Sequence, residues 1–295
     1  MPYSFGLIGY PLEHSLSPRI HAEFLRVCGL QGKYDLFPIP NDDHKEKELK
    51  RMIQRVKEGE LNGINVTIPY KQNVLPYLDD LCGDAKMAGA VNTIYAINGN
   101  VFGENTDVEG FLLDVHNLID LSEKEDALVF GAGGAARAVV AGLVKKGWKV
   151  TIAARQVHQA SQLVQDIRAS MEIEVSLKGL NIEFCSLNET GTIFQKLGER
   201  LQLVVNCTPV GMLGHANRSL FPEDIEIHDK LCVYDLVYNP RQTPLLKHVE
   251  KLGLRGRNGI GMLLEQARRS FEIWTGCAPS CPVEGIIQDL YEVYS

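Results

Sequence analysis

The chain has 295 residues, of which 45% are hydrophobic and 23% are charged, and its formal net charge is −7 at pH 7. This length exceeds one ordinary hydrophobic core, so two domains are expected. The negative charge gives no indication of binding to nucleic acid or an anionic membrane, and no apolar run approaches the roughly 20 residues of a membrane span.

The seven cysteines are scattered along the sequence. Cys277 and Cys281 lie closest together, but no second pair matches them, so they lack zinc-ligand spacing and no metal is expected. The first residues lack the charged start and long apolar stretch of a signal peptide. We therefore expect a cytoplasmic protein whose cysteines are reduced thiols.

Strand and helix patterns alternate from the N-terminus onward. Residues 4–11 predict a strand that enters a turn, and residues 17–30 predict a helix with apolar side chains at helical spacing. Residues 33–40 predict a second strand, and residues 45–59 a charged amphipathic helix. This order is typical of an α/β fold with a mainly parallel sheet covered by helices.

Lys71 follows a short apolar strand within residues 63–73. Pro69 ends this strand, because proline cannot donate to a strand ladder. A lysine at such a position is most simply a surface residue. The other interpretation places it in an active site, because α/β sheets bind ligands beyond the carboxyl ends of their strands. The strand alone does not decide between the two.

Residues 90–107 differ from this pattern, since Asn98-Gly99 predicts a two-residue hairpin turn. With that turn, Asn92 lies opposite Asn105, and Asp107 joins the same face if the second strand stays regular. Three polar side chains would then gather at the open end of the hairpin. They form either a solvated sheet face or part of a site.

A second unit begins near Glu125, after a predicted connecting helix over residues 108–121. Residues 131–136 fit the pattern G-x-G-x-x-A between a strand and an apolar helix, which is the context of a dinucleotide site. Free N–H groups at the start of that helix would hold a pyrophosphate. Small residues needed only for helix packing are the alternative explanation.

Arg155 ends the second strand of this unit. NAD-binding proteins usually carry Asp or Glu here to bind the ribose 2′-hydroxyl, and no carboxylate follows before Asp166. The planar guanidinium suits a 2′-phosphate. NADP is therefore expected, with NAD as the open alternative. Strand patterns continue at residues 182–187, 201–209 and 230–240, and the chain is predicted to be helical from Gly259 to its end, including residues 282–294.

Several stretches from residue 9 to residue 267 occur in the order found in a known enzyme family: GYPLEHSLSPRIH, NVTIPYK, AVNT, GENTD, GAGGAARA, NCTPVGM, DLVYNP followed by TPLL, and NGIGMLLEQA. Together they resemble the shikimate dehydrogenase family. The resemblance implies an enzyme that interconverts 3-dehydroshikimate and shikimate with NADPH, on the pathway to aromatic amino acids through chorismate.

The resemblance also implies roles for individual residues. Lys71 and Asp107 match the catalytic pair. The substrate-binding positions match Ser15, Ser17, Thr67, Asn92, Gln266 and Tyr238, the last at the junction of substrate and cofactor. The cofactor-binding positions match Gly131, Ala132, Gly133, Gly134, Ala135, Arg155 and Gly259. The family's NADP-type members usually show Asn-Arg-Ser/Thr and a further basic residue after the second strand, whereas residues 154–159 here keep only the arginine.

The residue types agree with these roles. Lys71 as an ammonium would stabilise a developing alkoxide and donate a proton, and Asp107 would orient it. Ser17 has two explanations: the N-cap of the helix that Pro18 begins, or part of a seat for the substrate's carboxylate. His14 and His21 are rival acid–bases, of which His21 is expected to be structural.

We therefore expect an α/β protein with a substrate domain formed by residues 1–106 and 262–295, and a Rossmann-type NADP-binding domain formed by residues 107–261. The substrate is expected in a cleft closed by domain movement. A quinate/shikimate dehydrogenase with NAD or dual cofactor use is the first alternative, and a non-catalytic nucleotide-binding sensor is the second. No nucleic-acid or membrane partner is expected, and monomer and homodimer both stay open.

Overall fold

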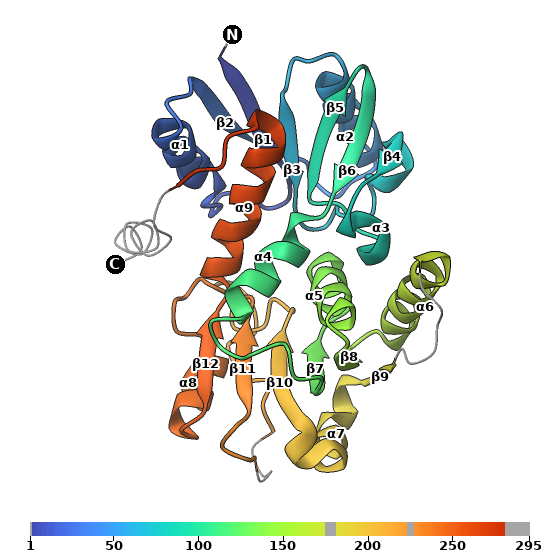
Figure 1. The fold of residues 1–295 in the computed structure, drawn as a ribbon, viewed down its shortest axis with the longest axis vertical. Helices are drawn as coiled ribbons and strands as arrows, with labels where there is room; N and C mark the ends of the chain where they lie inside the picture. Colours follow the sequence, from blue (N-terminus) through green and yellow to red (C-terminus); the bar gives the residue numbers. More distant parts are fainter. Residues whose placement is uncertain (1, 175–180, 223–226, 281–295) are drawn as a thin grey trace. The chain divides into compact units, whose positions relative to one another are not determined.

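The structure is a computed structural model that describes residues 2–174, 181–222 and 227–280. The chain forms two compact units (Figure 1): one contains the described residues up to Gly110 and from Leu264 onward, and the other contains Phe111–Leu263. The helix predicted over residues 282–294 lies outside the described residues, as does Cys281. No helix in the described ranges is both long and apolar enough to span a bilayer.

The first unit is built on a six-stranded mixed sheet with the order β2-β1-β3-β5-β6-β4. Its strands are β1 (Tyr3–Gly9), β2 (Gly32–Pro38), β3 (Gly63–Val66), β4 (Asp80–Leu81), β5 (Thr93–Ile97) and β6 (Asn100–Glu104). Its helices are α1 (Ser17–Val27), α2 (Lys45–Lys57), α3 (Asp84–Ala88), the start of α4 (Thr106–Val115) and most of α9 (Ile260–Thr275), with a short 3-10 helix at Leu75–Tyr77.

Apolar spacing explains how the helices cover this sheet. Along α2, the buried side chains Leu49, Met52, Ile53 and Val56 repeat at helical spacing, which gives the helix one apolar face. These side chains belong to a core cluster with strand residues such as Ile64. α1 and α9 contribute a second, aromatic contact region, in which Phe271 and Trp274 pack on Phe5, and Phe24 packs on Phe271.

The hairpin has the predicted register, with Ile97 paired to Asn100 and Thr93 paired to Glu104. Asn98 and Gly99 both have positive φ angles, as the turn requires. The condition for placing Asp107 on that face, a second strand that stays regular as far as Asp107, is not met. β6 ends at Glu104 and the chain turns into α4 at Thr106, because the Asn105 side chain accepts the backbone N–H of Asp107 at 3.1 Å.

The second unit contains a six-stranded sheet with the order β12-β11-β10-β7-β8-β9, and every pairing in it is parallel. The strands are β7 (Asp126–Phe130), β8 (Lys149–Ala154), β9 (Ile182–Ser186), β10 (Leu201–Asn206), β11 (Cys232–Asp235) and β12 (Arg255–Asn258). The helices are α5 (Gly134–Lys145), α6 (Val157–Glu174), α7 (Thr190–Leu197) and α8 (Pro244–Lys251), with 3-10 turns at Leu187–Glu189 and Gly198–Arg200. The α/β class is confirmed, and β12 is a strand that the sequence did not predict.

Cys28 and Cys277 are paired as a disulfide, so the expectation that all cysteines are reduced thiols is wrong for these two. Cys28 directly follows α1 and Cys277 lies just past α9, with Cα atoms 6.6 Å apart across a sequence separation of 249 residues. Sequence spacing cannot reveal such a pair, because packing of α1 near α9 brings the two residues together.

Thiol titration tests this pairing. The unfolded, unreduced protein is expected to show two fewer thiols than the reduced protein. Cys28→Ser should abolish that difference, because it removes one partner of the bond. Cys232→Ser is the matched control, since Cys232 is a buried free thiol: it should lower both counts by one and preserve the difference. Equal counts for the wild type before and after reduction would rule the bond out.

Candidate active site

Lys71 and Asp107 meet in the first unit. Lys71 lies in the turn after β3, where its carbonyl accepts the N–H of Val91 at 2.8 Å, and Asp107 lies in the first turn of α4. The Lys71 ammonium donates to Asp107 Oδ2, and the two side chains are only 12% and 7% exposed. The surface interpretation of Lys71 is therefore wrong. An ammonium has three hydrogens, so two stay available beside this carboxylate.

Asn92 fixes the other oxygen of the same carboxylate. Its Nδ2 donates to Asp107 Oδ1 at 3.0 Å and to Gln266 Oε1 at 3.2 Å. Asn105 holds the backbone by accepting the N–H of Asp107 and donating to Ala90 O at 2.8 Å. The structure thus brings together Lys71, Asp107, Asn92 and Gln266, from four separate stretches of the chain.

Ser15, Ser17 and Thr67 lie in the same unit: Ser15 in the loop before α1, Ser17 at the start of α1, and Thr67 just after β3. Thr67 follows β3 directly, and its N–H donates to Ile8 O at 2.9 Å. Ser17 does not act as the N-cap: it is the first residue of α1, the N-cap is Leu16, and Ser15 Oγ accepts the N–H of Ser17 at 3.3 Å. The capping explanation of Ser17 is therefore wrong.

The two histidines near these serines differ in environment. His14 is exposed in the loop before α1. His21 is fully buried and stacks on Tyr34 with ring centroids 4.2 Å apart. Burial lowers the pKa of His21 to about 3, so its ring is neutral at physiological pH and has no proton to donate as an imidazolium. This agrees with the structural role expected for His21.

The glycine turn of the second unit joins β7 to α5. Gly131 has φ +103°, a conformation that favours glycine, and its N–H donates to Ala153 O at 2.9 Å. Gly133 is the N-cap of α5, and no side chain caps this end. A Cβ added to Gly133 would meet no atom within 4 Å. The backbone at the start of α5 is therefore open to an anion, and the turn fits a pyrophosphate.

Arg155 follows β8 directly and is exposed. Asp166 is the first carboxylate after it, but Asp166 accepts Arg137 at 2.7 Å and Gln162 at 2.8 Å. The carboxylate is therefore committed to other partners, and Arg155 is the charged group directly at the strand end. This arrangement favours a ribose that carries a 2′-phosphate.

Two loops follow the carboxyl ends of β10 and β11, and a buried carboxylate ties them together. Asp235 Oδ1 accepts Asn206 Nδ2 at 2.8 Å and the N–H of Val237 at 3.1 Å, and Oδ2 accepts the Thr243 hydroxyl at 2.6 Å. The partly buried Tyr238 lies in the second loop. Gly259 has a packing requirement of its own, because a Cβ there would collide with the backbone of Leu236.

Replacing Asp235 with asparagine is expected to remove a pH-dependent part of the stability. Burial raises the pKa of Asp235 to about 6 from 3.8, against the opposing hydrogen bonds, so the folded state holds more protons than the unfolded state between these values. The free energy of unfolding of the wild type should therefore fall relative to that of the variant as the pH rises from about 4 to about 6, by about 3 kcal/mol.

Urea titrations of the wild type and Asp235→Asn at several pH values measure this difference. Asparagine is a suitable replacement because the Thr243 hydroxyl can turn and accept a hydrogen bond from the new amide. Curves of stability against pH that run parallel from pH ~4 to ~6 would contradict a raised pKa at Asp235.

Comparison with known proteins decides the family. The family model described as "Shikimate dehydrogenase substrate binding domain" matches residues 7–94, and "Shikimate 5'-dehydrogenase C-terminal domain" matches residues 259–288. A shikimate dehydrogenase (NADP(+)) of Carboxydothermus hydrogenoformans is 37% identical over 279 residues, which cover 94% of this chain and 93% of that protein. The chain belongs to the shikimate dehydrogenase family.

Solved structures agree with this family. A shikimate dehydrogenase crystallised in complex with NADP+ superposes with a TM-score of 0.86 at 32% identity, covering 100% of this chain and 96% of that one. A quinate dehydrogenase of Corynebacterium glutamicum in complex with NAD has a TM-score of 0.81 at 27% identity, covering 99% of both chains. The fold expected from the resemblance to the shikimate dehydrogenase family is therefore confirmed.

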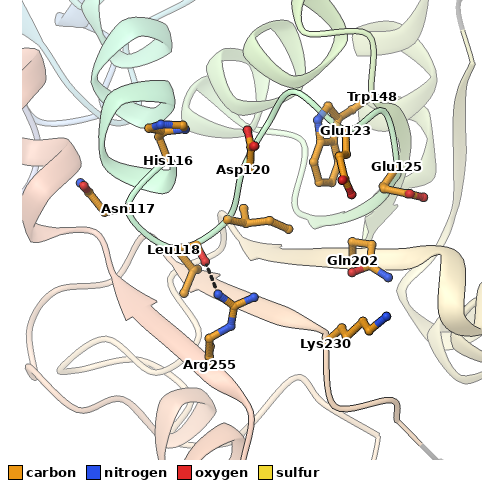
Figure 2. A pocket seen from close by; sticks show the side chains of 11 residues that line it. His116, Asn117, Leu118, Asp120, Glu123, Glu125, Trp148, Gln202, Lys230 and Arg255 are labelled. Carbon is orange, nitrogen blue, oxygen red and sulfur yellow. Dashed lines mark hydrogen bonds between the residues drawn. The ribbon is translucent and has the colours of Figure 1, made fainter.

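One hollow of the second unit lies away from the glycine turn (Figure 2), with a volume of about 490 Å³. Glu125, Gln202 and Arg255 line it from the amino ends of β7, β10 and β12. The glycine turn lies at the carboxyl end of β7, which is where parallel sheets bind their ligands. This hollow is therefore not the dinucleotide site expected for a member of the shikimate dehydrogenase family.

Sequence reasoning missed the buried polar residues behind Asn92: Thr93, Thr106, Ser270 and Asn65. The only indication of them in the sequence was a polar residue at a position that strand or helix spacing assigns to the interior. Asn65, for example, lies between Ile64 and Val66 in a strand whose four residues are all buried. In this member of the shikimate dehydrogenase family, Thr93 and Thr106 contact the amide that donates to Asp107, and Asn65 and Ser270 contact those two threonines or the Asn92 backbone.

Proposed function

We propose that this chain is a shikimate dehydrogenase, which reversibly reduces 3-dehydroshikimate to shikimate with NADPH. The observation that carries the proposal is the buried Lys71–Asp107 pair, joined by Asn92 and Gln266 in a chain of this family. Reduction of a hydroxylated cyclic ketone requires a proton donor for the carbonyl oxygen, and amide groups are suited to bind the ring hydroxyls.

Lys71 is proposed to serve as the general acid of the reduction. The Lys71 ammonium stabilises negative charge on the carbonyl oxygen and gives it a proton, and in the reverse direction the amine takes the proton from the hydroxyl. Asp107 keeps the ammonium in place through Oδ2 while Asn92 holds Oδ1. The lysine thus acts from a fixed position instead of as a mobile surface cation.

The substrate is proposed to bind to the first unit. Asn92 and Gln266 offer amides that both donate and accept, and Thr67 offers a hydroxyl, as the ring hydroxyls require. Ser15 and Ser17 at the start of α1 are suited to the carboxylate, because a helix N-terminus favours negative charge. Tyr238 is proposed to contact the substrate from the loop after β11. A site built this way rejects analogues that lack a hydroxyl.

NADP(H) is proposed to bind to the second unit, where NADPH would supply the hydride for the reduction and NADP+ would accept it in the oxidation. The pyrophosphate is assigned to the turn formed by Gly131, Ala132, Gly133, Gly134 and Ala135, and the 2′-phosphate to Arg155. Gly259 is proposed as a further contact of the cofactor. We therefore propose a substrate domain formed by residues 1–106 and 262–295 and a cofactor domain formed by residues 107–261.

A four-way assay tests the proposal: initial rates at the nicotinamide absorbance band with shikimate or quinate, each with NADP or NAD. We expect the highest kcat/KM with shikimate and NADP. A preference for quinate with NAD would support the alternative, to which the similarity with the Corynebacterium enzyme and the single basic residue Arg155 point. No absorbance change with folded protein in all four arms would favour a nucleotide-binding sensor. We further propose a cytoplasmic monomer or homodimer that binds no nucleic acid.

A further inference from the structure

Three hydroxyl groups lie buried behind the Asn92 side chain: Thr93 in β5, Thr106 at the start of α4, and Ser270 in α9. The Thr93 and Ser270 oxygens are 2.7 Å apart, those of Thr106 and Ser270 are 3.0 Å apart, and those of the two threonines are 3.3 Å apart. We call these three groups the hydroxyl triangle. Ser270 is 177 residues from Thr93 and 164 residues from Thr106 in sequence.

The backbone N–H of Thr106 determines which way the Asn92 amide faces, and the hydroxyl triangle adds contacts to both of its polar atoms. This N–H donates at 2.8 Å to the Asn92 side chain, and because a backbone N–H only donates, the atom there must be Oδ1. The Thr93 hydroxyl lies 3.0 Å from the same oxygen, and the Thr106 hydroxyl lies 3.2 Å from it and 2.9 Å from Nδ2. The NH₂ group also donates to Asp107 and Gln266.

A second asparagine anchors the hydroxyl triangle from behind. Asn65 Nδ2 donates to Ser270 Oγ at 3.0 Å, to Thr93 Oγ1 at 3.1 Å and to the carbonyl of Asn92 at 3.0 Å. Because that carbonyl only accepts, the orientation of the Asn65 amide is fixed as well. Tyr34 closes the network by donating to Asn65 Oδ1 at 2.9 Å.

Ser270 is the hub of this network, since its oxygen contacts Asn65, Thr93 and Thr106. It also lies 3.0 Å from the carbonyl of Gln266, one turn earlier on α9. A hydroxyl has one hydrogen and two lone pairs, so if the Gln266 carbonyl takes the hydrogen, Ser270 accepts from two of the other three groups at a time. Thr93 and Thr106 each have one hydrogen, which goes either to Ser270 or to the Asn92 oxygen, so the three hydroxyls and the Asn92 amide share one network.

We propose that Ser270 and Thr106 are positioning residues, whose hydroxyls hold the Asn92 amide with its NH₂ group on Asp107 and so keep that carboxylate turned toward Lys71. Neither residue is assigned a contact with the substrate. Without the hydroxyl triangle, the Asn92 side chain keeps the backbone N–H of Thr106 but loses its hydroxyl contacts, so its NH₂ group can shift away from Asp107 Oδ1. The carboxylate then loses one donor and can leave its position opposite the ammonium. The kinetic part of the proposal rests on the proposed function.

Two substitutions test the proposal kinetically. Ser270→Ala removes the hub, and Thr106→Val removes one hydroxyl with little change in volume. Both are expected to lower kcat for shikimate oxidation about tenfold and to change KM for shikimate less, about threefold, because Asp107 is displaced while Asn92 is the only substrate-binding group that is disturbed. Thr106→Ser restores the hydroxyl and is expected to restore kcat, which a loss of packing alone would not produce.

Thr275→Val is the matched control. Thr275 lies on the same helix α9, and its hydroxyl donates to Phe271 O at 2.8 Å in the way that Ser270 does to Gln266, but it has no bond to the hydroxyl triangle. This variant should lose some thermal stability and keep the kcat of the wild type. If Ser270→Ala and Thr106→Val also lose stability but keep the wild-type kcat, their hydroxyls are only structural and the proposal is wrong.

A crystal structure of Ser270→Ala gives a readout independent of turnover. The distance from Asn92 Nδ2 to Asp107 Oδ1, now 3.0 Å, should exceed hydrogen-bonding range. An unchanged Asn92 amide would overturn the positioning role. A wild-type protein that does not oxidise shikimate would overturn the proposed function, and the crystallographic result would still decide the role of Ser270.

Discussion

Lys71→Ala is expected to lower kcat for shikimate oxidation by about three orders of magnitude, while KM for shikimate changes less than about fivefold. The ammonium is the group assigned to the transferred proton, so its loss removes an interaction made mainly in the transition state. Steady-state kinetics at saturating NADP measures the two constants. Thermal unfolding is recorded in parallel, because the substitution also removes the cation beside Asp107.

Stability and catalysis can be separated in this pair. Asp107 is 7% exposed on its side chain, so removing its partner leaves a buried charge and should cost about 3 kcal/mol of stability. Lys71→Ala/Asp107→Asn removes that charge as well. It is expected to recover most of the lost stability and none of the lost kcat. Recovery of both would mean that Lys71 acts through the fold and not through proton transfer.

Lys86→Ala is the control for loss of a lysine from the same unit. Lys86 forms an exposed ion pair with Asp80 at 3.5 Å, and such pairs contribute little to stability. Its kcat and thermal stability should match those of the wild type. If Lys71→Ala retains more than about a tenth of the wild-type kcat, the assignment of Lys71 as the general acid is wrong.

The contact between Asn92 and Asp107 shows which part of the site the sequence predicts and which part it does not. The turn Asn98-Gly99 fixed the register of the hairpin, so the approach of Asn92 to the end of β6 followed from counting residues. The position of Asp107 did not follow from the sequence. Its position depends on the Asn105 side chain, which accepts the Asp107 N–H and starts α4, and an asparagine is equally compatible with a strand end or a helix start.

The remaining features depend on contacts between distant segments. Ser270 is one polar residue on a long amphipathic helix, and only the packing of α9 against β5 and α4 places its hydroxyl beside Thr93 and Thr106. The Cys28–Cys277 bond has the same origin, because it joins the ends of α1 and α9. Sequence patterns specify local structure and sheet order, whereas such pairings depend on tertiary geometry that no local rule contains.

Gly133→Ala is expected to weaken NADP binding while leaving the fold unchanged. Gly133 has φ −81° and ψ −174°, which alanine adopts without strain, and a Cβ there meets no atom of the chain within 4 Å. The added methyl group would occupy the space in which a pyrophosphate approaches the start of α5. We expect KM for NADP to rise at least about tenfold, with kcat at saturation and KM for shikimate close to wild type.

Gly131→Ala provides the contrast within the same turn. Gly131 has φ +103°, and its Cβ would lie 3.2 Å from Thr208 Cγ2 and 3.3 Å from Cys207 O, so alanine is strained there whatever binds nearby. Thermal unfolding without cofactor should therefore show a loss of stability for Gly131→Ala and none for Gly133→Ala. Titration with NADP should show weaker binding in both. If Gly133→Ala binds NADP as tightly as the wild type, the open backbone at the start of α5 is not the pyrophosphate site, and the glycines of this turn serve packing alone.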